Sequence, residues 1–295
     1  MTPVRSVDGW AYLESTRQLT DNLLARYAPS VEAEPRSLHE AMRYSLMAGG
    51  KRLRPILCLA AFEYCGGKPR EKDDPVHLAM AALEMVHTYS LIHDDLPCMD
   101  DDDLRRGLPT VHKKFGEALA VLAGDALHVV AFELMARTNS IPAVAELSAA
   151  VGTSGMLGGQ VADLEAEGRR VTEAEISNIH ARKTGALIRG SVRIGAILAG
   201  ADQKMLARLT SYGEKIGLAF QIVDDVLDIE GDARILGKEI GSDSKNQKAT
   251  YPAAVGLETA KARAGGLIDE ALALFEPYDD NVLTYIARYI GQREN

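Results

Sequence analysis

The segment 76–95 constrains the fold more than any other feature. Its stretch LAMAALEMVHTYSLIH is apolar on nearly every side of the helix that it predicts. A helix that is apolar all round is buried among other helices. Ala, Leu, Glu and Met are frequent along the chain, and no alternating strand pattern of useful length occurs. The sequence therefore predicts an all-α fold, with further helices at 10–27, 37–64, 116–137, 142–165, 172–199, 202–230 and 252–275.

Three breaks separate these predicted helices, at 65–75, 139–142 and 230–252. None of them is a Ser/Gly-rich linker, so we expect one domain over residues 1–295. The last break is about twenty residues long, which is typical of a functional lid or of disorder. It contains three lysines, which are either solvated or clamp an anion: Lys238, Lys245 and Lys248.

Charge and cysteine content limit the class of protein. The net charge of −9 and the pI of about 5.4 argue against nonspecific binding of nucleic acid, which depends on Lys and Arg meeting phosphates. The N-terminus shows no signal peptide, and no apolar run is long enough for stable membrane insertion. Cys58, Cys65 and Cys98 form no CxxC pattern, so we expect free thiols in the cytoplasm.

A run of acids follows the apolar segment, in HDDLPCMDDDDLRRG at 93–107. Asp94 and Asp95 lie at the C-terminal end of the predicted helix, where the helix dipole is already negative, so cations are expected close by. On an unbroken helix Asp100 would lie about 240° round the axis from Asp94 and could not share an ion with it. Pro97 disfavours continuation of the helix, and a break there can bring Asp100 back toward Asp94.

A second acidic cluster lies in LAFQIVDDVLDIE at 218–230. The helical spacing predicts an amphipathic core stripe of Ala219, Ile222, Val223, Val226 and Leu227. The polar residues are predicted to share the opposite face: Gln221, Asp224, Asp225 and Asp228. Asp224 and Asp228 are one turn apart, so their carboxylates can meet one ion. A solvated polar face is the alternative interpretation.

Two all-oxygen clusters suit a hard cation. Mg²⁺ usually takes one or two carboxylates and completes its shell with waters and substrate phosphates, whereas zinc would require His or Cys at closer spacing. Neither cluster matches a calcium-binding EF-hand loop. Basic residues flank the acids in GGKRLRP at 49–55, at Arg105 and Arg106, and at Lys183. Carboxylates accompanied by Arg and Lys suggest a diphosphate site, although each basic residue taken alone is more often plain surface.

The motifs GGKRLRP, HDDLPCMDDDDLRRG, KTGALIRG and FQIVDDVLDIEGD with LGKEIGSD occur in one order between about residues 49 and 252. In order and spacing they resemble the trans-isoprenyl diphosphate synthases, and in particular the bacterial short-chain type that makes farnesyl diphosphate. The resemblance implies an all-α bundle around a deep central cavity, usually in a homodimer. It also implies the condensation of isopentenyl diphosphate with dimethylallyl or geranyl diphosphate, with three Mg²⁺ ions or Mn²⁺ in their place.

The same resemblance assigns roles to residues. The implied metal ligands are Asp94, Asp95, Asp100, Asp224, Asp225 and Asp228. Further contacts to the allylic diphosphate are implied for Arg105, Lys183 and Lys238. The implied isopentenyl diphosphate pocket consists of Lys51, Arg54, His87 and Arg106. Thr184 and Gln221 match polar residues near the leaving group, so the catalytic candidates are Lys183, Thr184, Gln221 and Arg105. No side-chain base is apparent, and the resemblance gives that role to the departing diphosphate.

Product length is predicted from the residues before the first acids. Tyr89 precedes Asp94 by five residues, or about 7.5 Å along a helix axis. In the family that the chain resembles, a bulky aromatic here forms a floor, so Tyr89 with Ser90 favours a C15 product over C20. A terpene cyclase would not need the second diphosphate pocket, and a non-catalytic subunit should have lost one acidic cluster. Both stay alternatives to the synthase.

Overall fold

A computed structural model describes residues 8–70, 73–230, 248–275 and 280–292, and Lys238 lies outside them. The predicted all-α fold is confirmed. The helices are α1 Gly9–Tyr27, α2 Arg36–Leu46, α3 Leu53–Tyr64, α4 Pro75–Asp94, α5 Val111–Phe115, α6 Glu117–Arg137, α7 Ile141–Val151, α8 Met156–Ala166, α9 Glu173–His180, α10 Ala186–Leu198, α11 Gln203–Glu230, α14 Tyr251–Val255, α15 Leu257–Leu272 and α16 Val282–Gly291. A π-helical turn η1 (Ala181–Gly185) and a 3₁₀ turn η2 (Ala273–Phe275) complete the helical segments.

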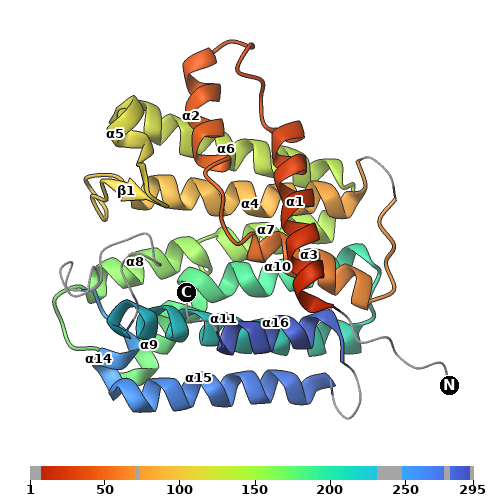
Figure 1. Cartoon of the computed structure of the whole chain (residues 1–295), viewed down its shortest axis with the longest axis vertical. Helices are drawn as coiled ribbons and strands as arrows, with labels where there is room; N and C mark the ends of the chain where they lie inside the picture. The colour runs from red at the N-terminus through yellow and green to blue at the C-terminus, as the bar shows by residue number, and fades with distance from the viewer. Residues whose placement is uncertain (1–7, 71–72, 231–247, 276–279, 293–295) are drawn as a thin grey trace.

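The long helices are stacked in rows. Figure 1 shows α6 and α4 above α10, with α11, α16 and α15 below them, while α1 and α2 run steeply across the upper rows. A two-residue hairpin, β1 (Leu104–Arg105) with β2 (Leu108–Pro109), projects beside the C-terminal end of α4. This stacking brings together helices that are far apart in the sequence, so α10 packs against both α3 and α11.

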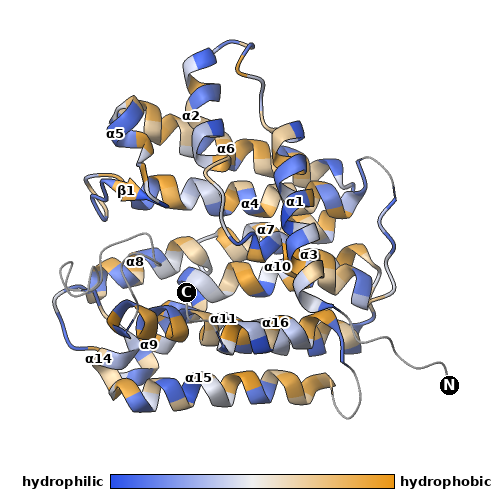
Figure 2. Cartoon of the chain, in the orientation of Figure 1, coloured by the Kyte–Doolittle hydropathy of each residue, from blue (hydrophilic) through white to orange (hydrophobic). Residues whose placement is uncertain are grey.

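Helices α4 and α15 show how burial follows the sequence pattern. Every residue of α4 from 78 to 86 is buried, which confirms that this helix lies inside the bundle. The outer helix α15 alternates between apolar and polar residues around its ribbon (Figure 2). Its buried residues recur at helical spacing: Ala260, Ala264, Leu267, Ile268 and Ala271. The outer helix therefore needs only one apolar face, whereas α4 needs apolar side chains all round.

Local signals fix where the helices begin. Asp74 caps α4, because its Oδ1 accepts a hydrogen bond from the Val76 N–H at 3.0 Å, and Pro75 occupies the first position of the helix. Thr172 and Glu175 form a capping box at the start of α9. These caps place the first residue of α4 and of α9, and so set which residues lie at the far end of each helix.

Several predicted helices are shorter than expected. The single helix predicted at 37–64 is wrong, because backbone with positive φ at Gly49, Gly50 and Arg52 ends α2 and restarts the chain as α3. The segments 142–165 and 252–275 are each divided as well, at 152–155 and at Gly256. The prediction also missed α5, α16 and the small hairpin. Short helices and turns leave too little periodicity to detect.

Helix α6 is the one helix in the described chain that is long and apolar enough to cross a membrane. It packs against α4 and α2, and several of its apolar residues are buried there. Three other apolar residues of this helix are exposed: Val121, Leu122 and Val129. Length and composition alone therefore give weak evidence for a membrane span, since the core helix of a helical bundle satisfies the same criteria.

Candidate active site

The first acidic cluster is formed where α4 ends. The helix ends at Asp94, and the chain turns through Pro97, so that the Asp100 N–H donates to the Asp94 carbonyl oxygen at 2.8 Å. This confirms the prediction that a break would return Asp100 to Asp94. Burial raises the pKa of the Asp94 carboxyl, and the negative charge of Asp100 acts in the same direction. The two carboxylates therefore form a pair that is stabilised by added positive charge.

Basic side chains lie close to the acids at the C-terminal end of α4, as the negative end of the helix dipole predicts. The Arg105 Nε lies 2.5 Å from Asp95 Oδ1, and its Nη2 lies 3.1 Å from Asp102 Oδ2. The Lys248 Nζ lies 2.7 Å from Asp100 Oδ2. Burial raises the pKa of Asp95 to about 7, although the Arg105 guanidinium acts in the opposite direction. The acids are thus buried enough to need these partners.

The second cluster lies on α11, but its side chains do not divide into two faces as predicted. Asp225 and Asp228 are buried, while Val223 and Leu227 of the predicted core stripe are partly exposed. The separation into an apolar and a polar face is therefore wrong. The C-terminal half of α11 is covered on several sides, because η1, α14 and α15 all pack against it.

Asp225 joins three segments. Its Oδ2 accepts a hydrogen bond from the Tyr251 N–H at 2.7 Å, and its Oδ1 accepts one from Gln221 Nε2 at 3.0 Å. The His180 Nε2 lies 3.4 Å from the same carboxylate. Gln221 in turn accepts a hydrogen bond from the Thr184 hydroxyl at 2.7 Å. Asp225 therefore ties α9, α11 and the start of α14 together.

A π-helical turn places Lys183 and Thr184. Residues 172–199, predicted as one helix, form a continuous helical run in which η1 interrupts the α-helical pattern. Such turns shift the side chains that follow and are frequent at functional sites. The Lys183 Nζ lies 2.6 Å from Asp163 Oδ2 of α8, and its charge also acts on Asp94. Lys183 thus lies between α8 and the end of α4.

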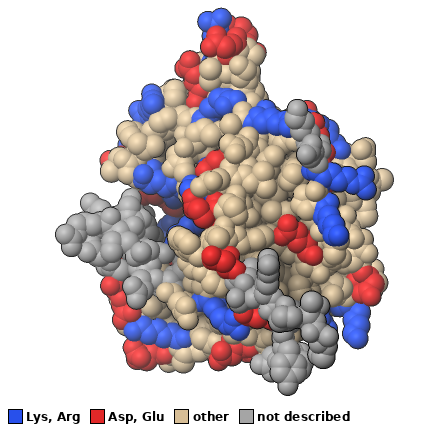
Figure 3. All heavy atoms as spheres, turned by 45° about the vertical axis from the view of Figure 1, so that its right-hand side comes forward, with Lys and Arg blue, Asp and Glu red and all other residues tan. Residues whose placement is uncertain are grey.

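The two acidic clusters face one region. Lys183, next to Thr184 and Gln221 on the α11 side, acts electrostatically on Asp94 of α4. Arg54 of α3 acts on Asp224 of α11. Figure 3 shows the surface hollowed on the left of the view, with Lys or Arg and Asp or Glu side chains along the hollow. A ligand in this region could contact residues from both clusters.

A separate group of basic side chains surrounds His87. Burial lowers the pKa of His87 well below its ordinary value, and the charges of Arg54 and Arg106 lower it further. Burial also lowers the pKa of Arg54 to about 10. The Arg54 Nε is buried and has no hydrogen-bond partner within the described residues. An excess of buried positive charge with an unused donor is suited to an anion.

The basic residues of GGKRLRP differ in their contacts. Arg106 donates a hydrogen bond from Nη1 to the carbonyl oxygen of Gly49, so the hairpin that follows the first acids touches this loop. Arg52, by contrast, is buried and paired with Glu84 and Asp21. Lys51 is exposed. The residue pattern alone did not distinguish Arg52 from Arg54, whereas the resemblance assigned only Arg54 to the pocket.

The predicted floor residue Tyr89 is buried between α4 and α6. Its ring stacks on the His128 ring with centroids 4.6 Å apart and an angle of 11° between their planes. Phe132 contacts His128 edge-on with centroids 5.1 Å apart. Ser90 faces back along α4, where its hydroxyl donates to the His87 carbonyl oxygen at 2.9 Å. Sequence reasoning missed His128 and Phe132, which lie about forty residues after Tyr89 in the chain. These two residues are one helix turn apart from each other.

The acidic side chains fit an open metal site. Within the described residues, no three His, Cys, Asp or Glu side chains form a group that could by itself hold a metal ion. The carboxylates of Asp94 and Asp100 instead lie close enough to repel each other. Mg²⁺ is commonly held by one or two carboxylates, with substrate phosphates as its remaining ligands. An oxygen-only pair of this kind fits that pattern.

Comparisons with known proteins agree with this geometry. Residues 35–290 match the family model described as polyprenyl synthetase. The farnesyl diphosphate synthase of Escherichia coli (strain K12) is 45% identical over 295 residues, which cover 95% of this chain and 97% of that protein. The geranylgeranyl diphosphate synthase of Cyanophora paradoxa is 46% identical over 297 residues, which cover 96% of each.

A solved structure is similar over nearly the same length. The geranyltransferase of Helicobacter pylori, complexed with magnesium and isoprenyl diphosphate, superposes with a TM-score of 0.81 at 30% identity. The superposition covers 97% of each chain. The helical fold and the paired acidic clusters place the chain among the all-α isoprenoid synthases. More narrowly, the chain belongs to the polyprenyl synthetase family.

Proposed function

We propose that this protein is a short-chain trans-prenyltransferase that condenses isopentenyl diphosphate with dimethylallyl or geranyl diphosphate and releases diphosphate. The observation that carries this proposal is the presence of two different regions of buried charged side chains, each of a kind that suits a diphosphate. One contains the paired carboxylates and their cations, and the other contains Arg54, Arg106 and His87. A condensation of two diphosphates requires two such regions, whereas a cyclase that acts on one diphosphate requires only the first.

The acidic region would hold the allylic substrate through Mg²⁺. The residues proposed to bind the ions are Asp94, Asp95, Asp100, Asp224, Asp225 and Asp228. When bound, the ions would neutralise charge on the leaving diphosphate. Asp94 and Asp100 are the stronger candidates of the first cluster, because their carboxylates lie close enough to repel each other. The number of ions and the use of Mn²⁺ remain predictions.

Positive side chains of the same region would stabilise the charge that develops on the leaving group. Lys183 and Arg105 are proposed for this role, because both act electrostatically on Asp94. Each is held by a carboxylate, Lys183 by Asp163 and Arg105 by Asp95, so its position is defined before substrate arrives. Lys238 is proposed for the same role on the resemblance alone.

Thr184 and Gln221 would orient the reaction rather than carry charge. Their side chains form one hydrogen-bonded pair, Thr184 Oγ1 to Gln221 Oε1, and Asp225 accepts from the Gln221 amide. This chain of hydrogen bonds fixes the Gln221 amide with its oxygen toward Thr184. A neutral oxygen held in this way can face a developing carbocation without forming a bond to it.

The second diphosphate would bind where Arg54, Arg106 and His87 meet, with Lys51 at the exposed edge. Direct ionic hydrogen bonds from guanidinium groups suit a diphosphate, because two N–H groups match two phosphate oxygens. This pocket borders the acidic region through Arg54, whose charge reaches Asp224. The two substrates would therefore meet between α3, α4 and α11.

Farnesyl diphosphate, a C15 product, is the product that we propose. Tyr89 is held by stacking on His128, so a growing chain along α4 would meet a supported ring rather than a mobile one. The Cyanophora paradoxa relative is a geranylgeranyl diphosphate synthase of similar identity, so the C20 product is the second candidate. The deep central cavity that the resemblance implies is also part of this proposal.

A homodimer is proposed as the working form, and the cytoplasm as its location. The exposed apolar residues Val121, Leu122 and Val129 on α6 would be covered in a dimer. Within the described chain Cys58, Cys65 and Cys98 are free thiols, in keeping with a reducing compartment.

Product analysis tests the proposed reaction and its length. The protein is incubated with isopentenyl diphosphate and each allylic diphosphate in turn, and the products are identified by mass. We expect a C15 product from the wild type and longer products from Tyr89→Ala. His128→Ala should lengthen the product less, since the Tyr89 ring is still present. A hydrocarbon formed from farnesyl diphosphate alone would contradict the synthase, and an unchanged product from Tyr89→Ala would remove the floor.

A further inference from the structure

The loop between α2 and α3 has an unusual backbone. Gly49, Gly50 and Arg52 all have positive φ, of 84°, 129° and 52°. Glycine adopts such values freely, but an arginine does so at a cost in free energy. Something must therefore hold Arg52 in place. The loop carries Lys51 and leads into Arg54 at the start of α3, and both residues are proposed to bind isopentenyl diphosphate.

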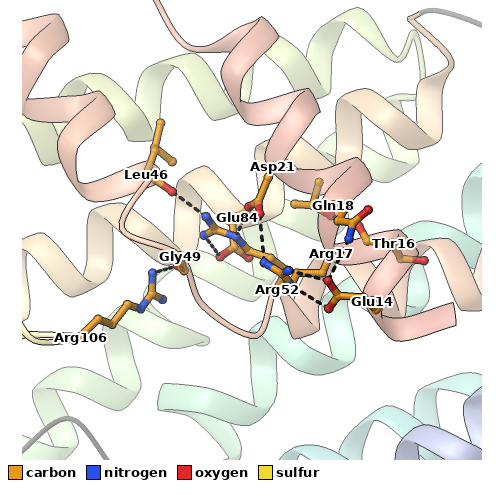
Figure 4. Close-up of polar contacts among 11 residues, drawn as sticks. Glu14, Thr16, Arg17, Gln18, Asp21, Leu46, Gly49, Arg52, Glu84 and Arg106 are labelled. Carbon is orange, nitrogen blue, oxygen red and sulfur yellow. Dashed lines mark hydrogen bonds and ion pairs between the residues drawn. The ribbon is translucent and has the colours of Figure 1, made fainter. Parts of the chain in front are cut away.

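The Arg52 side chain reaches three elements. Its Nη1 lies 2.8 Å from Glu84 Oε1 on α4, and its Nε lies 2.9 Å from Asp21 Oδ1 on α1. Its Nη2 donates to the Leu46 carbonyl oxygen at 2.7 Å, which satisfies an acceptor at the end of α2. Figure 4 shows these contacts converging on one guanidinium. Only 1% of the Arg52 side chain is exposed, so it cannot itself touch a ligand.

Glu84, the partner of Arg52, also affects the charge balance around His87. It is buried on α4, three residues before His87, and its other oxygen, Oε2, has no hydrogen-bond partner within the described residues. Its negative charge acts on Arg54 and on Arg106, as well as pairing with Arg52. Glu84 thus supplies negative charge to a region where four arginines surround His87.

The loop is also touched from the other side. Arg106 donates to the Gly49 carbonyl oxygen, and a β-carbon at position 50 would come within 2.7 Å of the Arg106 guanidinium. The loop is therefore held by Arg106 on one side, at the left of Figure 4, and by the Arg52–Glu84 pair on the other. Its backbone fixes where Lys51 and Arg54 leave the chain.

We infer that Arg52 and Glu84 are positioning residues for the isopentenyl diphosphate pocket, an inference that rests on the proposed function. The pair does not contact the substrate. It holds the 49–52 loop, with its positive φ angles, in place, and it keeps Arg54 and Arg106 close together by offsetting their repulsion. Loss of the pair should weaken binding of isopentenyl diphosphate and leave binding of the allylic diphosphate unchanged.

Calorimetric binding of isopentenyl diphosphate to the full-length protein tests the inference. Arg52→Lys keeps the positive charge but cannot reach three acceptors at once. Its dissociation constant should rise about tenfold or more, as expected when the support of a binding group is lost. The KM for geranyl diphosphate should stay at the wild-type value. Glu84→Gln, which keeps the shape but removes the charge, should shift the same constant in the same direction.

Arg43→Lys is the matched control. Arg43 also uses one guanidinium to bind three acceptors, the carbonyl oxygens of Ala25, Ala28 and Pro29, but these lie at the end of α1 and not in the loop. Its replacement should lower the melting temperature without changing either substrate constant. If Arg52→Lys fails to fold, the double variant Arg52→Met with Glu84→Leu removes both partners together, so that neither is left as an unpaired buried charge.

The outcomes separate the inference from the proposed function. Wild-type affinity for isopentenyl diphosphate in a folded Arg52→Lys or double variant would overturn the inference, and so would an equal loss for both substrates. In either case Arg54→Met should still lose affinity, and the proposed function would stand. If the wild type itself binds no isopentenyl diphosphate, both fail.

Discussion

Two regions differ in how their charges are balanced: the acidic region around Asp94 and Asp100, and the basic pocket of Arg54, Arg106 and His87. In the acidic region each described cation is already paired: Arg105 with Asp95, Lys183 with Asp163, and Lys248 with Asp100. The basic pocket instead has an excess of positive charge around His87. The first region therefore has little positive charge to spare for an anion and is suited to bind one through metal ions. The second is suited to bind a diphosphate directly.

The largest expected effect is on the acidic region. Asp94→Ala should lower turnover by about 1,000-fold, because it removes a proposed metal ligand that acts as the leaving-group charge develops. Binding of isopentenyl diphosphate should not change, since Asp94 is not part of the basic pocket. Steady-state kinetics and calorimetry measure the two effects.

Asp103→Ala is the control for that substitution. Asp103 belongs to the same acidic run but is exposed and paired with Lys113 at 2.7 Å. Exposed pairs of this kind contribute little, so its turnover should match the wild type. Equal losses in the two variants would show that the run acts only through its total charge.

The next effect is on the basic pocket. Arg54→Met should raise the KM for isopentenyl diphosphate by about 100-fold, since it removes a buried charge aimed at an anion. The KM for geranyl diphosphate should not change. Kinetics at varied concentrations of each substrate measure this, and a rise in both constants would mean that the two regions do not act separately.

A smaller effect is expected from the loop glycines. Gly50→Ala should raise the KM for isopentenyl diphosphate about tenfold, because the added carbon would displace the Arg106 guanidinium. Gly49→Ala strains the backbone in the same way, but its β-carbon would meet nothing within 4 Å. If both variants change KM equally, backbone strain and not contact with Arg106 is the cause.

The smallest effect concerns pH. The pKa of His87 lies well below its ordinary value in the folded protein, so unfolding takes up a proton as pH falls below about 6.5. This group therefore removes up to about 1.4 kcal/mol of folding stability per pH unit below that point. His87→Gln should lose stability less steeply between pH 7 and pH 5 in urea unfolding, by the same relation. Parallel curves for the two proteins would show that folding does not lower the pKa of His87.

Much of this fold could be predicted because its signals are local. The apolar run of α4, its end near Asp94 and the break at Pro97 were all read from the order of residues, and the Asp100 to Asp94 contact confirms the last of them. The burial of α4 follows from the absence of any polar face. These features need no knowledge of distant segments.

The features that were missed depend on distant contacts. Arg52 and Arg54 look alike in GGKRLRP, and only Glu84 and Asp21, brought in by α4 and α1, determine which of them is paired. The position of the buried Asp225 carboxylate depends on the N–H of Tyr251, a residue that begins another helix. The support of Tyr89 by His128 arises because α6 packs against α4. Helical periodicity contains no information about such neighbours.

Metal removal tests the central comparison most directly. Calorimetry of each substrate is carried out in Mg²⁺ and again after chelation with EDTA. We predict that geranyl diphosphate binding is lost after chelation, whereas isopentenyl diphosphate keeps its affinity. Loss of both substrates on chelation, or retention of both, would contradict the assignment of one region to metal-bridged binding and the other to direct binding by arginine.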